Sequence, residues 1–469
     1  MRTEKDSLGE IILPEDVLYG IHSLRSVMNF IKSGEVIDPY FIKAFLQVKK
    51  AAAITNFNIG LLVKEKFVYI EKSIDLLLAE IDKTIEGKSN SIYTKIIIDP
   101  YQGGAGTSMN MNINEVITNT ALKLMGKDIG DYETIHPLDH VNMSQSTNDT
   151  YPTALKIASI VLLRELQNSC AVLQNSLQEK ENEFKNILKL GRTQFQDAVP
   201  ITLGQEFGAY SQAISRDRWR LYNAEERLRS VNLGGTAVGN SITANKDYLL
   251  NVNTILKKIT GLPIAKGEDL IDVTQNLDVF VEVHGIVKSN AVSVLKICND
   301  LRILSSGPIE GIGEIILPAV QAGSSIMPGK VNPVILENSI QVCELIKGND
   351  QIISNVVSSG NLELNAFIPL LAHLFLKSVK MLRDSNLNLS QKCIIDISAD
   401  TNRCKQNLLN SSAIAAALIP RYGYETIQKV LKDANEQNIS FVKALIMNKI
   451  LSETELDSIL SKEIGLDLE

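Results

Sequence analysis

The stretch TALKIASIVLLRELQNSCAVLQNSLQEKENEFKNILKL, residues 153–190, contains neither glycine nor proline. Apolar side chains recur along it at helical spacing, for example at Ile157, Ile160 and Leu163. This period matches one face of a helix, and glycine and proline are the two residues that most weaken a helix interior. The stretch therefore predicts one helix that is much longer than an ordinary helix of a globular protein.

Four further segments have the same character and also predict long helices. Residues 209–233 and 370–388 contain no glycine or proline, and residues 268–306 and 333–359 each contain a single glycine. A long helix tolerates one such glycine. Five helices of this length predict an all-α protein built around an elongated bundle. Several are apolar on more than one face, so we expect more than one chain to bury them; a single monomeric bundle is the alternative.

The helical pattern divides the chain into three regions. Residues 1–140 begin with a turn-rich segment and continue with helical patterns, residues 141–395 contain the five long helices, and helices from residue 396 to 469 are short. A chain of this length is expected to form more than one domain. We predict a mostly helical N-terminal domain, a central bundle domain and a small helical C-terminal domain.

Composition and charge exclude several classes of protein. The formal net charge of the 469 residues is -7, and no run of Lys and Arg alternates with aromatic residues, so no nucleic-acid partner is expected. The first residues are charged, and no stretch approaches the roughly 18 apolar residues of a membrane span. We therefore expect a cytoplasmic protein with no membrane partner. The five cysteines are scattered without a Cys-x-x-Cys motif, which predicts buried thiols and no metal site.

The segment QAGSSIMPGKVN, residues 321–332, predicts a mobile polar loop that leads into a helix. Pro333 follows it, and proline can occupy the first position of a helix without losing a hydrogen bond. Backbone amides and the helix dipole favour an anion at such an N-terminus. Lys330 adds a positive charge, and Asn332 can cap the helix. The expected ligand is a carboxylate or a phosphate.

Hydroxyl-rich motifs precede several predicted helices, and two of them flank the helix over residues 153–190. If this helix is straight, its 38 residues hold Thr147 and Thr193 about 55 Å apart. The two side chains cannot contact one small ligand within a single chain. If both serve the same site, a neighbouring copy must supply one of them, which predicts a symmetric homo-oligomer.

Four motifs resemble the signatures of the aspartase/fumarase superfamily of lyases. They are GGAGTS (residues 103–108), HVNMSQSTND (residues 140–149), GRTQFQDAVP (residues 191–200) and GSSIMPGKVNP (residues 323–333). The resemblance covers nearly the whole chain. It implies an all-α fold of three domains and a homotetramer, in which the five-helix bundles join into a core of twenty helices and each site is built from three chains.

The activity implied by the resemblance is reversible elimination of ammonia from L-aspartate to give fumarate, with no cofactor. This reaction removes a weakly acidic proton from the carbon next to a carboxylate and passes through an enediolate. Electrostatic stabilisation of the developing charge is the largest help that a protein can give to such a step. We therefore expect the site to contain neutral hydrogen-bond donors and one cation that point at a carboxylate of the substrate.

Within residues 321–332, the resemblance implies that Ser324 is the general base and that Ser325 donates a hydrogen bond to the enediolate. Lys330 and Asn332 would bind the α-carboxylate by an ion pair and a side-chain amide. Without the resemblance, an exposed lysine and a helix cap would be the ordinary interpretation. A serine base needs amides and a cation to stabilise its alkoxide, which this loop can supply.

The other implied substrate ligands belong to three motifs. By resemblance, Ser146 and Thr147 hold the carboxylate that becomes the enediolate, Asn148 faces the amino group, and Thr107 donates to the substrate. An ordinary capping cluster and a flexible glycine-rich turn are the alternative interpretations of these segments. Thr193, in the third motif, is also assigned to substrate binding.

Gln194 belongs to the same assignment and argues against hydration chemistry. Fumarases and some aspartases carry a histidine at this position, and glutamine can form hydrogen bonds but cannot carry a proton. Its usual partner, Glu337, then keeps only a capping or solvated role. A further departure is the segment Asn240–Thr243, where the family usually has Thr-Gly-Leu-Asn.

Two alternatives stay open. One is fumarase, or another lyase of the superfamily that acts on a related substituted succinate; Gln194 and Thr147 argue against fumarase. The other is a helical scaffold without catalytic activity. The retention of Ser324, Lys330 and the other candidate ligands argues against the scaffold, because a chain that has lost activity is expected to lose such residues first.

Overall fold

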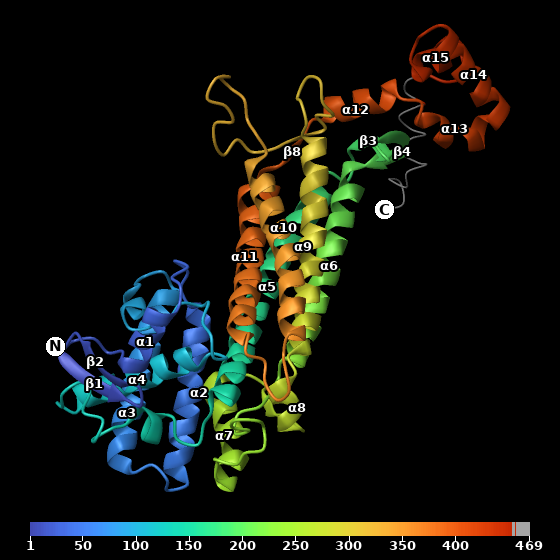
Figure 1. Ribbon diagram of the computed structural model, residues 1–469. Helices are drawn as coiled ribbons and strands as arrows, with labels where there is room; N and C mark the ends of the chain where they lie inside the picture. Colours follow the sequence, from blue (N-terminus) through green and yellow to red (C-terminus); the bar gives the residue numbers. More distant parts are fainter. Residues whose placement is uncertain (453–454, 456–469) are drawn as a thin grey trace. The chain divides into compact units, whose positions relative to one another are not determined.

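The computed structural model describes residues 1–452 and 455 (Figure 1). The chain divides into two compact units. Unit 1 contains Met1–Leu166, Arg220–Lys288 and Leu345–Met381, and unit 2 contains Gln167–Trp219, Ser289–Glu344 and the described residues from Leu382 onward. The last part of the expected C-terminal domain, 453–454 and 456–469, lies outside the described residues.

Five long helices dominate the described chain, which confirms the predicted all-α class. They are α5 (Thr147–Glu183), α6 (Leu203–Arg227), α9 (Asp278–Leu304), α10 (Val334–Ser358) and α11 (Ile368–Lys392). Each of them contributes one segment to unit 1 and another to unit 2. The division at residues 140 and 395 therefore stays a prediction, because the compact units divide along the long helices.

The first of these helices ends earlier than predicted. α5 ends at Glu183, and β3 (Leu188–Thr193) pairs with β4 (Gln196–Thr202) in an antiparallel hairpin. The register shifts around Gly191, where a Cβ atom would lie 2.5 Å from the carbonyl oxygen of Val199. The GRTQFQDAVP motif, residues 191–200, was expected to stand at the start of the next helix. This was wrong, because the motif lies in a complete hairpin that precedes α6.

Unit 1 also contains further helices and short two-stranded sheets. These are β1 (Arg2–Asp6), β2 (Gly9–Leu13), α1 (Ile21–Asn29), α2 (Pro39–Asn58), α3 (Lys64–Ile85), the 3-10 helix η1 (Ser91–Thr94), α4 (Thr107–Leu124), the π-helix η2 (Pro137–Val141), β5 (Ser230–Val231), α7 (Lys246–Thr260), β6 (Ala265–Lys266) and α8 (Leu270–Gln275). α2 packs against α3 and α7 (Figure 1). Phe41 of α2 packs edge-to-face on Tyr151 of α5, with ring centroids 4.8 Å apart. This aromatic contact anchors α2 beside the start of α5.

The long helices of unit 1 pack through both apolar and polar contacts. Phe280 of α9 meets Phe375 of α11 edge-to-face, with ring centroids 5.3 Å apart. Asn349 of α10 donates a hydrogen bond of 3.0 Å to the hydroxyl of Ser378 on α11. Both contacts are buried, so they fix the helices against one another and give the unit a rigid core.

In unit 2 a buried polar cluster joins four of the long helices. The amide of Asn386 on α11 donates to Asn290 Oδ1 on α9 (3.3 Å) and to Cys170 Sγ on α5 (3.4 Å). Asn290 in turn donates to Asp217 on α6 at 3.4 Å. Because an unpaired polar group inside a bundle is costly, such a cluster favours one arrangement of the helices.

Short elements complete unit 2. These are β7 (Ile315–Ile316), the 3-10 helix η3 (Ile394–Asp396), β8 (Ser398–Ala399), α12 (Thr401–Asn410), α13 (Ile414–Tyr422), α14 (Tyr424–Glu436) and α15 (Phe441–Met447). β7 and β8 form a short antiparallel pair. The helices α13, α14 and α15 form a small cluster (Figure 1), whose apolar core includes Leu418, Ile427, Leu445 and also Leu190 of β3. The hairpin is thus attached to the C-terminal helices by a buried apolar contact.

Candidate active site

Two of the candidate hydroxyls in unit 1 lie at the starts of neighbouring helices. Thr107 is the first residue of α4, and Thr147 is the first residue of α5. Gly106 has φ 89°, and a Cβ there would lie 2.2 Å from the ring of Tyr151. Only glycine permits this close approach, so the two helix starts pack directly on each other. The Thr107 hydroxyl is exposed and donates to Gly104 O at 2.8 Å.

The turn before α5 orders the neighbouring candidates. Ser146 Oγ accepts a hydrogen bond from the backbone N–H of Asn148 at 3.2 Å, which is the geometry of a helix cap. The Asn148 side-chain amide donates to Ala237 O at 2.7 Å. Ser146 and Asn148 are both half-buried, and Thr147 is buried. The capping role of Ser146 leaves its hydroxyl proton free to point at a ligand.

Asp149 is a buried residue of this site that the sequence analysis did not assign. Its carboxylate accepts backbone N–H bonds from Ser146 (3.0 Å), Gly234 (3.1 Å) and Thr236 (3.0 Å). Burial raises the pKa of Asp149 to about 6, although these amides and Lys49 act in the opposite direction. Asp149 therefore joins the Ser146 turn to the loop around Gly234.

Lys49 of α2 is a second unassigned residue, and its side chain is fully buried. Its Nζ donates to Asn110 Oδ1 (2.6 Å), Asn142 Oδ1 (3.0 Å) and Gln145 Oε1 (3.0 Å). Burial lowers the pKa of Lys49 to about 7, while the charge of Asp149 acts to raise it. The Lys49 amino group is thus held next to the turn that carries Ser146 and Thr147, with its hydrogen bonds directed to three side-chain oxygens. The only sequence signal was a lysine on the apolar face of a predicted helix.

The departure at residues 240–243 affects the loop that contacts this turn. Ser241, at the position where the family usually has glycine, has φ 61°, and its N–H donates to Gly235 O at 2.9 Å. The loop therefore keeps a left-handed backbone without the glycine that usually permits it. Gly239, with φ 91°, remains necessary, because a Cβ there would lie 2.4 Å from Leu270 O.

Thr193 and Gln194 lie in unit 2, at the tip of the β3–β4 hairpin. Thr193 pairs with Gln196, and the two residues between them, Gln194 and Phe195, have φ 54° and 61°. Positive φ at both central residues defines the tight turn that matches the twist of a hairpin. Thr193, Gln194 and Phe195 are all exposed, so the turn presents them to a ligand or a neighbouring molecule.

The loop with Ser324 is closed at its base. The Gly323 N–H donates to Lys330 O (2.8 Å), and the Asn332 side-chain amide donates to Gly323 O (2.6 Å). A Cβ at residue 323 would lie 2.6 Å from Lys330 O, so the glycine is required there. Asn332 therefore closes the loop through a hydrogen bond that the sequence analysis did not foresee.

The hydroxyl of Ser324 receives two backbone hydrogen bonds. Its Oγ accepts from the N–H groups of Ile326 (3.2 Å) and Met327 (3.0 Å). Two amide donors at one oxygen stabilise a negative charge there, which is the requirement for a serine that acts as a base. Ser325 next to it is exposed. The geometry is thus compatible with the role that the sequence analysis expects of Ser324.

Two cavities of unit 2 meet at Lys330. One of about 420 Å³ is lined by Ser324, Met327 and Lys330. The other, of about 1090 Å³, has residues from the hairpin tip, the loop and α9 in its walls, including Phe195, Arg302, Lys330, Asn332 and Glu337. Arg302 Nη2 lies 4.0 Å from Glu337 Oε1, so Glu337 has a cationic neighbour within its own unit. The lysine and the arginine make this region suitable for an anion.

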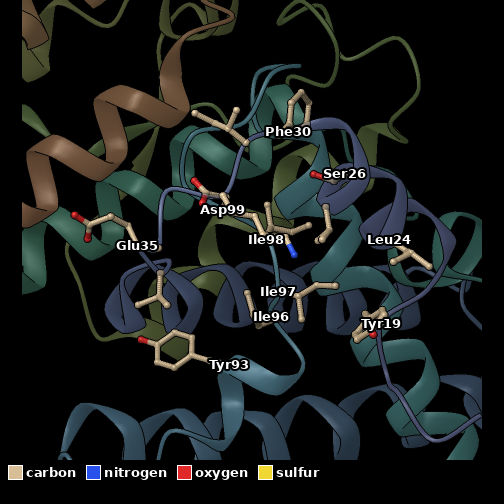
Figure 2. Close-up of a pocket in the computed structure, with 15 residues that line it drawn as sticks. Tyr19, Leu24, Ser26, Phe30, Glu35, Tyr93, Ile96, Ile97, Ile98 and Asp99 are labelled. Atoms are coloured by element: carbon tan, nitrogen blue, oxygen red, sulfur yellow. The ribbon is translucent and has the colours of Figure 1, made fainter. Parts of the chain in front are cut away.

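The candidate residues therefore form two groups. Thr107, Ser146, Thr147 and Asn148 belong to unit 1, whereas Thr193, Gln194, Ser324, Ser325, Lys330 and Asn332 belong to unit 2. A separate cavity of about 480 Å³ in unit 1, with Phe30, Ile97 and Asp99 in its wall (Figure 2), contains none of them. Within residues 1–452 and 455, no group of three His, Cys, Asp or Glu side chains could hold a metal ion. None of the described helices has the length and apolar character of a membrane span.

The helical fold, with hydroxyls, amides and a lysine of this kind, is what the four motifs predict of a lyase. Residues 9–348 match the family model described as lyase. The chain therefore belongs to this lyase family, the aspartase/fumarase superfamily that the four motifs resemble.

Individual members of this family are similar to the chain over nearly its whole length. The chain is 43% identical over 461 residues to an aspartate ammonia-lyase from a Bacillus species, covering 98% of this chain and 96% of the relative. It is 42% identical over 465 residues to an aspartate ammonia-lyase from Helicobacter pylori, covering 99% and 97%. Among solved structures, it superposes on the fumarate lyase:delta crystallin of Brucella melitensis with a TM-score of 0.92 and 41% identity, covering 99% of both chains. A class II fumarase from Schistosoma mansoni gives a TM-score of 0.89 at 30% identity, covering 99% of this chain and 98% of the fumarase.

Proposed function

We propose that this protein reversibly eliminates ammonia from L-aspartate to give fumarate. The observation that carries the proposal is the environment of Ser324, whose Oγ accepts two backbone amides and lines a cavity with Lys330. The names of the two relatives at 43% and 42% identity support the same substrate. The reaction is therefore a carbon-nitrogen elimination.

In the proposed mechanism the Ser324 alkoxide removes a proton from the carbon next to the substrate's β-carboxylate. The electron pair of the broken C–H bond moves into that carboxylate and gives an enediolate, which Ser146, Thr147 and Ser325 stabilise by hydrogen bonds. The pair then returns to form the carbon–carbon double bond of fumarate, and the C–N bond breaks to release ammonia. Lys330 and Asn332 hold the α-carboxylate, and Asn148, Thr107, Thr193 and Gln194 orient the substrate.

The site is proposed to form in a homotetramer in the cytoplasm, with each site built from three chains. The length of α5 supports this assembly, because the helix is continuous over 37 residues, or about 55 Å at the usual helical rise. Thr147 begins this helix and Thr193 follows its end in the sequence. Residues from several chains are therefore needed if both hydroxyls contact one substrate. Sedimentation of the purified protein tests the assembly.

The decisive experiment compares L-aspartate with L-malate under identical conditions. Fumarate, measured by its absorbance, should form from aspartate together with ammonia. It should not form from malate, because Gln194 cannot transfer a proton. Turnover of malate alone would favour the fumarase alternative. If no dicarboxylate is turned over or raises the thermal stability, the scaffold alternative is correct.

The role of Ser324 is tested separately. Ser324→Ala removes the base but leaves the amides, Lys330 and Asn332 in place, so substrate binding should stay near that of the wild type while turnover is lost. Binding is measured by calorimetry and turnover by ammonia release. Turnover close to that of the wild type would refute the assignment of the base.

A further inference from the structure

Glu314 is a fully buried carboxylate of unit 2 that the mechanism above does not use. Its Oε1 accepts from Arg192 Nη2 (2.8 Å) and from Asn407 Nδ2 (3.1 Å). Its Oε2 accepts from Arg192 Nη1 (3.1 Å) and lies 3.1 Å from Lys189 Nζ. The pair with Arg192 is bidentate, which fixes both the distance and the orientation of the guanidinium.

On one side, Glu314 holds the hairpin that carries two candidate substrate ligands. Arg192 and Lys189 both belong to β3, and Arg192 directly precedes Thr193 at the hairpin tip. The bulge at Gly191 turns this end of the strand, and bulges are known to re-aim side chains in this way. The direction of the tip is therefore set by where the Arg192 side chain is anchored.

On the other side, Glu314 begins the segment that leads to the Ser324 loop. It directly precedes β7. Both polar groups of its backbone form hydrogen bonds: its N–H donates to Leu304 O (2.9 Å), and its carbonyl accepts from the Asp400 N–H (3.0 Å). The residue thus has little freedom to move. The wall of the 1090 Å³ cavity contains Phe195 of the hairpin tip and Lys330 of the loop, and also Gly313 and Ile315 on either side of Glu314. Both segments therefore line one cavity beside this anchor.

The charge of the buried Glu314 carboxylate is balanced only while its contacts with Arg192 and Lys189 persist. Burial alone would raise the pKa of Glu314, but Arg192, Lys189 and Asn407 outweigh it and hold this pKa below the usual value. The carboxylate is therefore ionised at neutral pH. Removal of one partner of such a buried pair leaves an uncompensated charge, which is strongly unfavourable.

We propose that Glu314 is a positioning residue. Its buried carboxylate fixes the Thr193–Gln194 hairpin, and its hydrogen-bonded backbone fixes the start of the segment that leads to the Ser324–Lys330 loop. This inference rests on the proposed function, because it gives those two segments a role in substrate turnover. It assigns the coupling of the segments to one residue that contacts no substrate.

Glu314→Gln tests the proposal. The amide group of glutamine cannot accept the bidentate pair, so both segments should shift and kcat/KM for L-aspartate should fall by at least about tenfold, mostly through kcat. Glu206→Gln is the matched control, because Glu206 also pairs with Lys189 but forms no hydrogen bond or ion pair with Arg192 within the described residues. It should change kcat and KM less than about threefold. Equal losses in the two variants would overturn the proposal.

Hydrogen exchange supplies a measurement that does not depend on activity. In Glu314→Gln the amides of residues 188–202 and of residues 317–332 should both exchange faster than in the wild type, while those of α14 should not change. Faster exchange in only one segment, or in neither, would overturn the coupling. If the wild type releases no ammonia from aspartate, the proposed function fails, and the exchange data still decide the role of Glu314.

A second variant is available if Glu314→Gln does not fold. Arg192→Lys keeps the charge but loses the bidentate geometry. It should reproduce the loss in kcat and the faster exchange of the hairpin in milder form, with a thermal midpoint close to that of the wild type. A wild-type kcat in this variant would contradict the proposal.

Discussion

The side-chain amide of Asn232 donates a hydrogen bond of 2.9 Å to the backbone carbonyl of Asn148. In a regular helix that carbonyl would accept from the N–H four residues later, but residue 152 is a proline and has none. Asn232 is fully buried and replaces the missing donor. Pro152 can therefore stand in the second turn of α5 without leaving a buried carbonyl unpaired, and Asn148 is held from both its backbone and its side chain.

Asn232→Ala should reduce both stability and turnover. The variant leaves the Asn148 carbonyl without a donor, and an unsatisfied buried group costs about 1–3 kcal/mol of unfolding free energy. Because Asn148 is a proposed substrate ligand, kcat/KM should also fall. Urea unfolding and ammonia release measure the two effects. Asn253→Ala is the control, because it removes a comparable buried bond, to Leu233 O at 3.0 Å, without contacting Asn148. It should be destabilised somewhat less, because Asn232 also bonds Thr153 and Thr274, and it should lose much less activity.

Lys49→Met should impair substrate binding. Methionine fills similar space, but Asn110, Asn142 and Gln145 lose the cation that orients their oxygens, so the turn with Ser146 and Thr147 should lose its fixed geometry. We expect kcat/KM for L-aspartate to fall by about tenfold or more, since small displacements of positioned groups have effects of this size. Steady-state kinetics with aspartate measures the change.

The control for this variant is the next lysine along α2. Lys50 is partly exposed and pairs with Asp75 of α3 on the surface of unit 1. Surface ion pairs contribute about 0–1 kcal/mol, so Lys50→Met should leave stability and kinetics nearly unchanged. A loss of activity in Lys50→Met equal to that in Lys49→Met would show that the effect belongs to α2 as a whole.

The long helices could be predicted from sequence because their period and their scarcity of glycine and proline are local properties. The β3–β4 hairpin could not. Leu188 and Leu190 extend the apolar pattern of α5, and a short apolar run does not distinguish a strand from a helix. The turn residues Gln194 and Phe195 also lack the Asn-Gly or Asp-Gly signal that usually marks such a hairpin.

The candidate site likewise contains residues that one local motif predicts and residues that only tertiary contacts reveal. Ser324 and Lys330 lie within one motif, so the sequence could propose both, Lys330 from the charge of the loop and Ser324 from the resemblance. Lys49 was not found, because its partners Asn110, Asn142 and Gln145 come from other segments, and only the folded chain brings their oxygens to one ammonium group. A buried charge is recognised by its partners, and these are defined by tertiary structure.

Ser241→Gly should stabilise the protein. Ser241 has φ 61°, and a left-handed backbone costs an L-residue roughly 1–2 kcal/mol. The greater freedom of glycine in the unfolded chain offsets about half of this gain, so the unfolding free energy should rise by about 0.5–1 kcal/mol. Activity should not decrease. Chemical denaturation measures the change.

Gly239→Ala in the same loop is the opposite test. Its φ of 91° and the 2.4 Å approach of a Cβ to Leu270 O both exclude a side chain. The variant should lose more than about 1 kcal/mol of unfolding free energy. If both substitutions changed stability in the same direction, backbone strain would not be the cause.

The last prediction concerns the pH dependence of stability, through His284 of α9. This histidine is fully buried, its Nδ1 lies 2.9 Å from Asp350 Oδ1, and its Nε2 has no hydrogen-bond partner among the described residues. Burial lowers the pKa of His284 below its usual value of 6.5, although Asp350 acts to raise it. Below pH 6.5 the unfolded chain therefore binds a proton that the folded chain excludes. Stability should fall as the pH decreases through this range.

His284→Gln removes this contribution while keeping an amide that can donate to Asp350. The loss of unfolding free energy between pH 7 and pH 5 should therefore be smaller in the variant than in the wild type, with an upper limit of about 1.4 kcal/mol per pH unit for one proton. Urea unfolding at both pH values measures the difference. At pH 7 the two proteins should differ little, because the histidine is then neutral in both the folded and most of the unfolded chains. An identical pH dependence in the two proteins would mean that His284 takes up its proton equally in both states, and that burial does not control its charge.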